Sequence, residues 1–383
     1  MNHIAILCDS NPFSKPRPAR LIEMLKEHYT LFIYGRECEG KEGLNIFSFP
    51  SAKSSSQRTP EENEAIFQAC LNKNFDFLLY TKEREILKEK LLSTPSLSLL
   101  IVEDITLLPF ALLHKEQNPK SKVMIDLREF YPLEYENDPK WLKSFGVFFE
   151  YLCATFLPKV DFALTVSEGI AKKYKEVYGL DCTLFLSLPP YFPLTPSKNE
   201  KIRLIYHGLI SADRESENLL EIASHLREGI EMNLMVLSNH PSFLQEFKNK
   251  AQKIPNLTLH PPVRLEEIIP FTSEFDVGLI TLKPNGFNNT HALPNKFFEY
   301  IQARLALLTT PLPSLKPMIE QYSLGKCSKD FSTHSIIESI NSLSLEEIQT
   351  YKQNASIASE KLNLSSNQVK ILEIIQNLLG ERK

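Results

Sequence analysis

Lys296 and Glu299 lie three residues apart in ALPNKFFEYIQARLALLTTP, residues 292–311, a segment otherwise as apolar as a buried one. Both types of side chain are costly to bury without a partner. Pro294 is favoured in the first turn of a helix, and a helix that begins there offers free N–H groups and a positive dipole end to an anion. Lys296 would then lie near a phosphate, and Glu299 could accept hydrogen bonds from a vicinal diol such as ribose. An ordinary i,i+3 ion pair on a half-buried helix remains the alternative.

A second candidate anion-binding element is YHGLISADRESENLLEIA, residues 206–223. We expect a strand to end at Gly208, a polar loop to follow, and a helix to begin near Glu215. Gly208 permits close approach of the backbone to a ligand, and Arg214 supplies a cation. Both candidate elements therefore favour a phosphate-bearing ligand such as a nucleoside diphosphate.

The elements around these residues alternate between strands and helices. Short, nearly continuous apolar runs are typical of parallel strands that are buried on both faces. We predict strands at residues 3–8, 30–34, 44–49, 75–80, 98–102, 122–126, 162–166, 182–186, 202–208, 233–238, 256–260, 276–282 and 305–310. Helical patterns lie between them, for example at residues 19–29 and 167–179, so the fold class is α/β with doubly wound parallel sheets.

The alternation is interrupted by LSLPPYFPLTPSKNEK, residues 186–201, which is rich in proline and polar residues and indicates a linker. A chain of 383 residues is also long enough for two domains. We therefore predict a first Rossmann-like domain, a linker, a second Rossmann-like domain and C-terminal helices that pack back toward the first domain. Their boundaries are residues 1–190, 191–201, 202–345 and 346–383.

The composition narrows the functional class. With 43% hydrophobic residues, 23% charged residues and a net charge of −4, the chain has no general attraction to nucleic acid. The nine histidines show no HxxxH spacing and no Asp-x-Asp triplet occurs, so we predict no dedicated metal site. The six cysteines are widely spaced, which suggests reduced cysteines in a cytoplasmic protein. The absence of GxGxxG argues against a dinucleotide enzyme.

The segment WLKSFGVFFEYLCATFLP, residues 141–158, has apolar residues at helical spacing. No run of 18 apolar residues occurs in the chain, so no spanning helix is expected. A core helix is the favoured interpretation. Lys140, Lys143 and Lys159 leave peripheral contact with anionic lipid open.

Several motifs together resemble one family. YHGLISADRESENLLEIA is followed by PNKFFEYIQARLALLTTPLPSLKPMIEQYSLG, and the first half contains MIDLREFYP and VDFALTVSEGIAKKYKEVYG. This combination is similar to the retaining glycosyltransferases of the GT-B fold, of the bacterial family 4 type. The likeness runs from about residue 1 to 345 and is strongest from 202 to 325. It implies two Rossmann-like domains that face a central cleft.

The resemblance also implies roles for individual residues. The second domain would hold the nucleotide sugar, with Glu299 on the ribose and with Lys296 and Arg214 neutralising the leaving diphosphate. Other donor contacts would come from Gly208, Asn288, Asn289, His291 and Asn295. The first domain would bind the acceptor near Arg17, Asp126, Arg128 and Glu129. The nucleotide sugar would be a substrate, and the resemblance calls for no metal and no cofactor.

The function implied is retaining, metal-independent transfer of a sugar to a glycan, lipid-linked or protein acceptor in bacterial surface glycan synthesis. The protein would be cytoplasmic, with peripheral association at the inner face of the membrane left open. Three positions depart from the family pattern: His291 replaces an acidic residue, Arg128 a histidine, and Leu209 a basic residue. Two alternatives remain: a GT-B protein that binds a sugar nucleotide or a partner without turnover, and a sugar-nucleotide epimerase.

Overall fold

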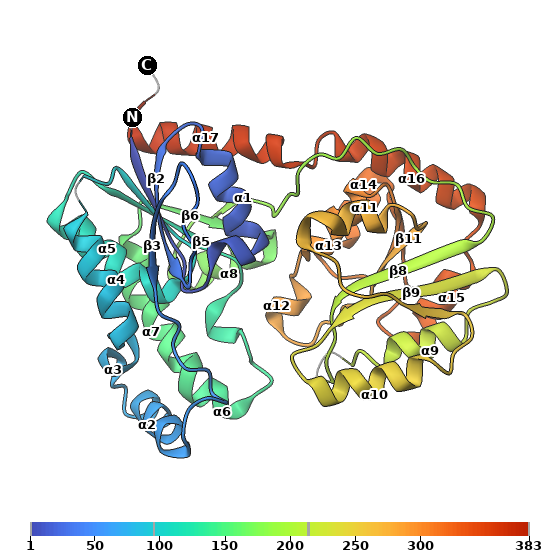
Figure 1. Ribbon diagram of the computed structural model, residues 1–383, viewed down its shortest axis with the longest axis horizontal. Coiled ribbons are helices and arrows are strands. Elements are labelled where there is room, and N and C mark those ends of the chain that lie inside the picture. The colour runs from blue at the N-terminus through green and yellow to red at the C-terminus, as the bar shows by residue number, and fades with distance from the viewer. Residues whose placement is uncertain (1, 95, 213–214, 382–383) are drawn as a thin grey trace. The chain divides into compact units, whose positions relative to one another are not determined.

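The computed structural model describes residues 2–94, 96–212 and 215–381, which fold as two compact α/β units (Figure 1). The first unit takes the described residues of Met1–Ser187, Gly286–Asn288 and Asn367–Lys383. The second takes those of Leu188–Asn285 and Asn289–Ser366. Each unit is built on one parallel sheet, so the predicted doubly wound α/β fold is confirmed.

The sheet of the first unit has seven strands in the order β3-β2-β1-β4-β5-β6-β7. Every residue of β4 is buried, as expected for a strand covered on both faces. The chain order reverses between β1 and β4, and ligands of open α/β sheets bind at the carboxyl ends of strands at such a switch point. The strands are β1 His3–Leu7, β2 Thr30–Arg36, β3 Asn45–Phe49, β4 Leu99–Val102, β5 Lys122–Leu127, β6 Phe162–Thr165 and β7 Thr183–Leu184.

Helices cover both faces of this sheet, with α1 and α8 on one side and α4, α5 and α7 on the other (Figure 1). The last helix, α17, packs on the first unit, where Gln368 donates a 2.9 Å hydrogen bond to the carbonyl of Met24. The helices are α1 Pro16–Leu25, α2 Pro60–Leu71, α3 Phe75–Leu79, α4 Lys82–Ser93, α5 Leu108–Gln117, α6 Pro139–Trp141, α7 Val147–Phe156, α8 Glu168–Tyr178 and α17 Leu364–Leu379.

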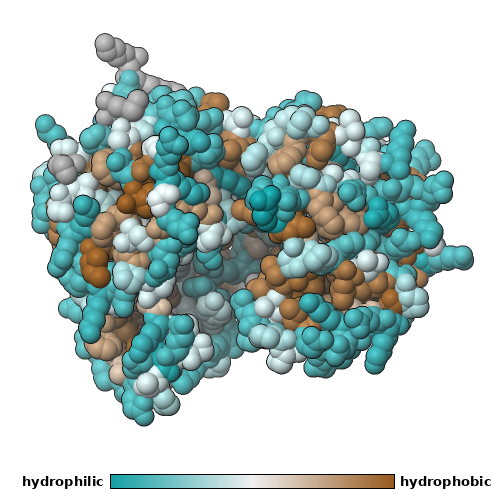
Figure 2. Space-filling view, in the orientation of Figure 1, coloured by the Kyte–Doolittle hydropathy of each residue, from teal (hydrophilic) through white to brown (hydrophobic). Residues whose placement is uncertain are grey.

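The apolar segment at residues 141–158 forms the end of α6, a π-helical turn at Leu142–Gly146, and α7. Phe148 and Leu152 are buried in the core of the first unit, which agrees with the core-helix interpretation. Among the helices of the described residues, none has the length and hydrophobicity that crossing a membrane requires. Polar side chains interrupt the apolar ones on the face shown in Figure 2.

The sheet of the second unit has six strands in the order β10-β9-β8-β11-β12-β13. Its chain order reverses between β8 and β11, which creates a second switch point. The short edge strand β13 was not predicted from the sequence. The strands are β8 Ile202–Leu209, β9 Ile230–Leu237, β10 Leu257–Leu259, β11 Val277–Ile280, β12 Ala306–Thr309 and β13 Gly325–Cys327.

In this unit, α9, α10 and α15 lie on one side of the sheet and α11, α13, α14 and α16 on the other (Figure 1). The helix expected near Glu215 begins instead at Asn218, and the helix expected at Pro294 begins at Asn295 with Pro294 as its N-cap. The helices are α9 Asn218–Ser224, α10 Pro241–Ala251, α11 Ile268–Thr272, α13 Asn295–Gln302, α14 Lys316–Tyr322, α15 Thr333–Asn341 and α16 Leu345–Ser359. The short helix α12, Phe287–Thr290, begins in the first unit and ends in the second.

One predicted strand is wrong. Residues 75–80, FDFLLY, form helix α3 and the residue after it. Both sheet positions beside β1 are taken by β2 and β4, and the chain between β3 and β4 folds as three consecutive helices. Leu78 and Leu79 are buried on one side of α3 while Phe77 is 52% exposed. A short apolar run can form either a buried strand or a short buried helix, and the hydrophobic pattern of six residues does not distinguish the two.

Candidate functional site

Lys296 lies beside the end of β8 in the second unit. Its ammonium nitrogen is 3.8 Å from the centroid of the Tyr206 ring, a cation–π contact. Gly208 has a φ of +126°, and a Cβ on it would lie 3.2 Å from the Lys296 Nζ atom. A glycine at this position therefore leaves room for the lysine as well as permitting the unusual backbone conformation. The structure thus brings together Lys296 and Gly208, two of the residues expected to bind the donor, and adds Tyr206.

Glu299 is one turn further along α13 and is only 4% exposed. Its Oε2 atom lies 3.5 Å from the Nε2 atom of His207. Burial, reinforced by the positive charge of Lys296, lowers the pKa of His207 to about 3, so its imidazole is neutral at physiological pH. Among the described residues, the His207 Nε2 atom has no hydrogen-bond partner. The carboxyl group of Glu299 therefore lies beside a neutral imidazole ring, and the sequence analysis did not identify His207 as its neighbour.

Tyr300 fixes α13 to β8. Its hydroxyl donates to the carbonyl of Ile205 at 3.3 Å and accepts from the backbone N–H of His207 at 3.2 Å. A Cβ on Gly278 of β11 would meet the Tyr300 ring at 2.3 Å, so the ring can sit there only because residue 278 is glycine. These contacts place the first turn of α13, with Lys296, at the switch point between β8 and β11. A helix N-terminus with an adjacent ammonium group is suited to a phosphate.

The remaining predicted donor residues have different surroundings. Asn295 is the first residue of α13 and is half-buried. The Asn289 amide donates to the carbonyl of Asn285 at 3.0 Å. The carbonyl of His291 accepts from Ser314 at 3.0 Å, and burial lowers the pKa of the His291 ring. Arg214 lies outside the described residues.

Asn288 belongs to the first unit, in the segment Gly286–Asn288. Its amide oxygen accepts from the Phe130 N–H at 2.7 Å, and its amide nitrogen donates to the Phe130 carbonyl at 3.1 Å. The side chain thus caps the backbone of the DLREF segment. Asn288 is therefore placed next to residues predicted for the acceptor side.

Arg17 and Asp126, predicted on the acceptor side, form a bidentate ion pair in which the Nη2 and Oδ1 atoms are 2.7 Å apart. The two side chains are only 7% and 1% exposed. Arg128 pairs with Asp104 and donates to the Glu103 carbonyl at 2.9 Å. One role expected for Arg128 was an ion pair with a neighbour such as Glu129. The carboxylate that pairs with it is instead that of Asp104.

Glu129 lies next to this group. Its backbone carbonyl accepts a 2.8 Å hydrogen bond from the hydroxyl of Tyr174. Burial raises the pKa of its carboxyl group. Its side chain therefore lies in an environment that disfavours the charged form.

Glu103 is the main residue at the carboxyl ends of the first unit's strands that the sequence analysis did not identify. It follows β4 directly, is completely buried, and neither carboxyl oxygen has a hydrogen-bond partner in the described part of the chain. Burial, with the negative charge of Asp126 adding to it, raises its pKa to about 8. The sequence did contain a pattern that could have identified it. Glu103 and Asp104 are two acidic residues directly after a buried apolar strand, and binding sites of parallel sheets form at the carboxyl ends of strands.

Asp9 completes the charged edge at the carboxyl end of β1. It is paired with Arg36 and Arg84 and accepts a 2.8 Å hydrogen bond from Thr106. Its pKa is lowered by the two arginines despite burial, which acts in the opposite direction. The first unit therefore carries paired arginines and carboxylates at its switch point. Within residues 2–94, 96–212 and 215–381, no group of three or more His, Cys, Asp or Glu residues could hold a metal ion.

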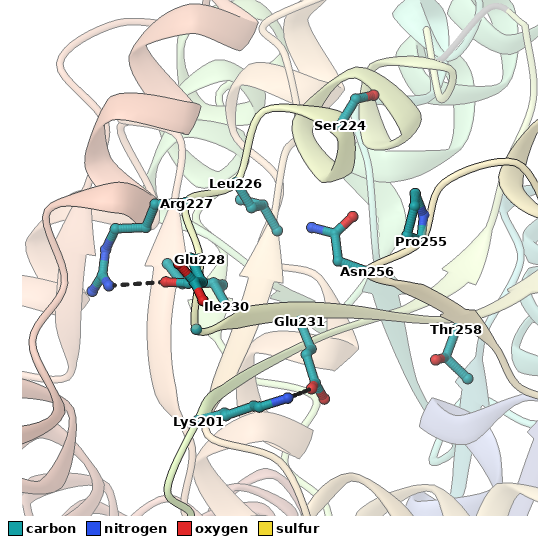
Figure 3. Close-up of a pocket in the computed structure, with 11 residues that line it drawn as sticks. Lys201, Ser224, Leu226, Arg227, Glu228, Ile230, Glu231, Pro255, Asn256 and Thr258 are labelled. Carbon is teal, nitrogen blue, oxygen red and sulfur yellow. Dashed lines mark hydrogen bonds and ion pairs between the residues drawn. The ribbon is translucent and has the colours of Figure 1, made fainter.

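The pocket shown in Figure 3 lies at the opposite edge of the second sheet. It has a volume of about 520 Å³ and lies at the amino ends of β8, β9 and β10. Lys201 and Glu231 in its lining are ion-paired at 2.8 Å, and Arg227 donates to the Leu343 carbonyl at 2.8 Å. Three of its charged side chains, those of Lys201, Glu231 and Arg227, are thus bonded to neighbours, and the pocket lies at the edge away from Lys296 and Glu299. We do not assign the donor site to it.

Comparison with known proteins supports the fold. No protein-family model and no curated protein sequence matches the chain. Several solved structures, however, match its fold. A sucrose-phosphate synthase from Thermosynechococcus elongatus superposes with a TM-score of 0.73 at 10% identity, with 100% of both chains covered.

Two further structures agree with the first. An α,α-trehalose-phosphate synthase (UDP-forming) from Burkholderia vietnamiensis gives a TM-score of 0.68 at 10% identity and covers 98% of this chain and 100% of its own. Anabaena HepE, solved with UDP and glucose, gives 0.66 at 11% identity and covers 98% of this chain and 100% of its own. These neighbours are GT-B glycosyltransferases, and the chain has their two-domain fold.

Proposed function

We propose that the protein is a glycosyltransferase that takes a sugar from a nucleoside-diphosphate donor bound in the second unit. The observation that carries this proposal is the arrangement of Lys296 and Glu299 on α13 beside Gly208 at the end of β8. A cation and a helix N-terminus suit the diphosphate, and a buried carboxylate one turn further suits a ribose diol. The solved structures with UDP and UDP-glucose make UDP-sugars the first donors to test.

In this mechanism, Lys296 and Arg214 neutralise the negative charge that builds up on the diphosphate as the glycosidic C–O bond breaks. Charge stabilisation of this kind contributes more in the transition state than in the ground state, so it accelerates the reaction. Glu299 accepts hydrogen bonds from the ribose hydroxyls and thereby orients the donor. The neutral ring of His207 adds no second charge beside Glu299, so the carboxylate keeps its capacity as an acceptor.

We propose that transfer retains the anomeric configuration. The acceptor hydroxyl attacks the anomeric carbon from the face on which the diphosphate leaves, and the electron pair of the broken C–O bond departs with the diphosphate. The hydroxyl proton passes to an oxygen of the leaving phosphate, so no separate side-chain base is required. Arg128 cannot act as that base because its guanidinium stays protonated.

The acceptor would bind at the charged edge of the first unit, near Arg128 and Glu129. A phosphorylated sugar is the first acceptor to test, because a solved neighbour, a trehalose-phosphate synthase from Burkholderia xenovorans, is in complex with glucose-6-phosphate. Glycan, lipid-linked and protein acceptors follow, in keeping with a cytoplasmic role in bacterial surface glycan synthesis. Peripheral contact with the inner face of the membrane would bring the enzyme to a lipid-linked acceptor.

A second candidate is a protein that binds a sugar nucleotide without turnover. It is favoured by the ion pairs of Arg17 with Asp126 and of Arg128 with Asp104, which occupy the charged groups predicted to meet an acceptor. Incubation with UDP-, GDP-, ADP- and dTDP-sugars, with nucleoside diphosphate as the readout, separates the candidates. Slow release of nucleoside diphosphate supports a transferase, and a new sugar isomer indicates an epimerase. Binding of the sugar nucleotide without release of nucleoside diphosphate indicates the second candidate.

Two additional arms of this assay test the finer claims. Addition of EDTA should leave the rate unchanged if transfer is metal-independent, and a loss of activity that Mg²⁺ restores would contradict that claim. Once an acceptor is found, the anomeric proton coupling of the product shows whether configuration is retained. An inverted product would overturn the proposed front-face attack while leaving donor binding intact.

A further inference from the structure

Two long polar side chains that the donor site does not use lie at the C-terminal end of helix α13 and just after it. Gln302 and Arg304 are both completely buried. They lie at the end of the helix opposite to Lys296, and they are part of the same sequence segment. Burial of an amide and a guanidinium is costly unless their hydrogen bonds are satisfied, so their partners indicate what they hold in place.

The amide of Gln302 joins two distant segments of the second unit. Its oxygen accepts from the backbone N–H of Phe192 at 3.1 Å. Its nitrogen donates to the carbonyls of Ser359 and Leu362, each at 2.9 Å. One side chain on α13 therefore holds the segment around Phe192 and the segment that follows α16.

Arg304 strengthens the same junction. Its Nη2 atom donates to the Phe192 carbonyl at 2.6 Å, and its Nη1 atom donates to the Gln302 carbonyl at 2.6 Å. Its φ of +64° is in the left-handed region, which is unfavourable for a residue other than glycine. From this backbone position the guanidinium reaches from the end of the helix to Phe192.

The two segments held in this way are chain connections between the units. The chain passes from the first unit to the second after Ser187 and, apart from the short segment Gly286–Asn288, returns to the first unit at Asn367. The connections are also bonded to each other, since the N–H of Leu364 donates to the carbonyl of Pro189 at 2.8 Å. We define residues 188–192 and 359–366 as the connecting segments. Both are attached to the helix that carries Lys296 and Glu299.

We propose that Gln302 and Arg304 are positioning residues that couple ligand binding at Lys296 and Glu299 to the connecting segments. A ligand bound at the N-terminal end of α13 reduces the motion of the whole short helix. The hydrogen bonds at its C-terminal end then also reduce the motion of the connecting segments. Coupling of this kind is reciprocal, so loosening the connecting segments should also weaken ligand binding. The identity of the ligand as a nucleoside diphosphate rests on the proposed function.

Hydrogen exchange of the free protein tests the attachment itself. Gln302→Met keeps the side-chain length and removes all three bonds, so amides of both connecting segments should exchange about tenfold faster, the effect of losing one or two hydrogen bonds. Arg304→Lys should affect mainly the segment at Phe192. Gln252→Met and Arg264→Lys make the same changes at exposed positions and serve as controls. Unchanged exchange in both connecting segments, with strands β8 and β11 protected as in the wild type, would overturn the attachment.

Exchange with saturating UDP, GDP or ADP tests the coupling. A bound diphosphate should slow exchange in the connecting segments of the wild type by about tenfold and leave them unaffected in Gln302→Met, even when the variant binds. Calorimetry should show the variant binding more weakly than the Gln252→Met control. Binding without slowed exchange in the wild type would overturn the coupling alone. Failure of the wild type to bind any of the three would overturn the coupling and the proposed function together.

Discussion

Replacement of Glu103 by glutamine should stabilise the first unit at neutral and alkaline pH. The buried carboxyl has its pKa raised from 4.5 to about 8, mainly by burial. The folded state therefore holds this proton more tightly than the unfolded chain does, and the stability that the protonated group contributes is complete below pH 4.5 and is lost as the pH rises to about 8. At about 1.4 kcal/mol for each pH unit, the wild type gives up about 3 kcal/mol by pH 7. Glutamine stays neutral and avoids that loss.

The assay is urea unfolding at pH 5, 7 and 9, followed by the fluorescence of the single tryptophan, Trp141, which lies in the first unit. Glu103→Gln should exceed the wild-type free energy of unfolding only slightly at pH 5 and increasingly at pH 7 and 9. Glu116→Gln, an exposed change on α5, is the control and should follow the wild type throughout. If the Glu103→Gln advantage were the same at pH 5 and pH 9, Glu103 would not be the titrating group and the account of this edge would be wrong.

Three further predictions concern the ligand sites. Glu299→Ala should weaken binding of the nucleotide donor by about 1–3 kcal/mol in calorimetry, because a charged acceptor of the ribose hydroxyls is lost; equal affinity in a folded variant would remove Glu299 from the site. Tyr206→Leu removes the ring beneath the Lys296 ammonium and should lower affinity for the bare diphosphate by about 0.5–1 kcal/mol, while Tyr206→Phe keeps the ring and the affinity; equal losses in both would implicate the hydroxyl instead. Arg128→Ala and Arg128→His should both reduce transfer without changing diphosphate affinity, since Arg128 is in the first unit; wild-type transfer by both would reduce Arg128 to a structural partner of Asp104.

The sequence predicted the features that depend on local pattern. Continuous apolar runs such as that of β4 identify buried parallel strands, because covering both faces removes the polar alternation. The apolar positions around Lys296 and Glu299 likewise located α13, with Pro294 marking its start. These signals lie within a few residues of each other. The strands and α13 could therefore be predicted without knowledge of tertiary contacts.

What the sequence did not predict depends on partners that are distant along the chain. The buried pair of Arg17 and Asp126 and the isolated carboxyl of Glu103 arise only when β1, β4 and β5 bring their carboxyl ends together. His207 meets Glu299 only because β8 and α13 pack against each other. Local periodicity carries no information on such pairings, so the sequence indicated most of the strands but not the charges that face each other at their carboxyl ends.

Calorimetric titration of UDP, GDP and ADP into the wild type, Lys296→Ala and Lys316→Ala tests the central claim most directly. Lys296 is predicted to bind the diphosphate, whereas Lys316 lies on α14 and its ammonium is 3.8 Å from Glu320. We expect the wild type and Lys316→Ala to bind at least one of the three nucleotides with equal affinity. Lys296→Ala should bind that nucleotide at least tenfold more weakly, the effect of losing one charge-assisted contact. Equal binding by all three proteins, or no binding by the wild type, would contradict the assignment of this site to a nucleoside diphosphate.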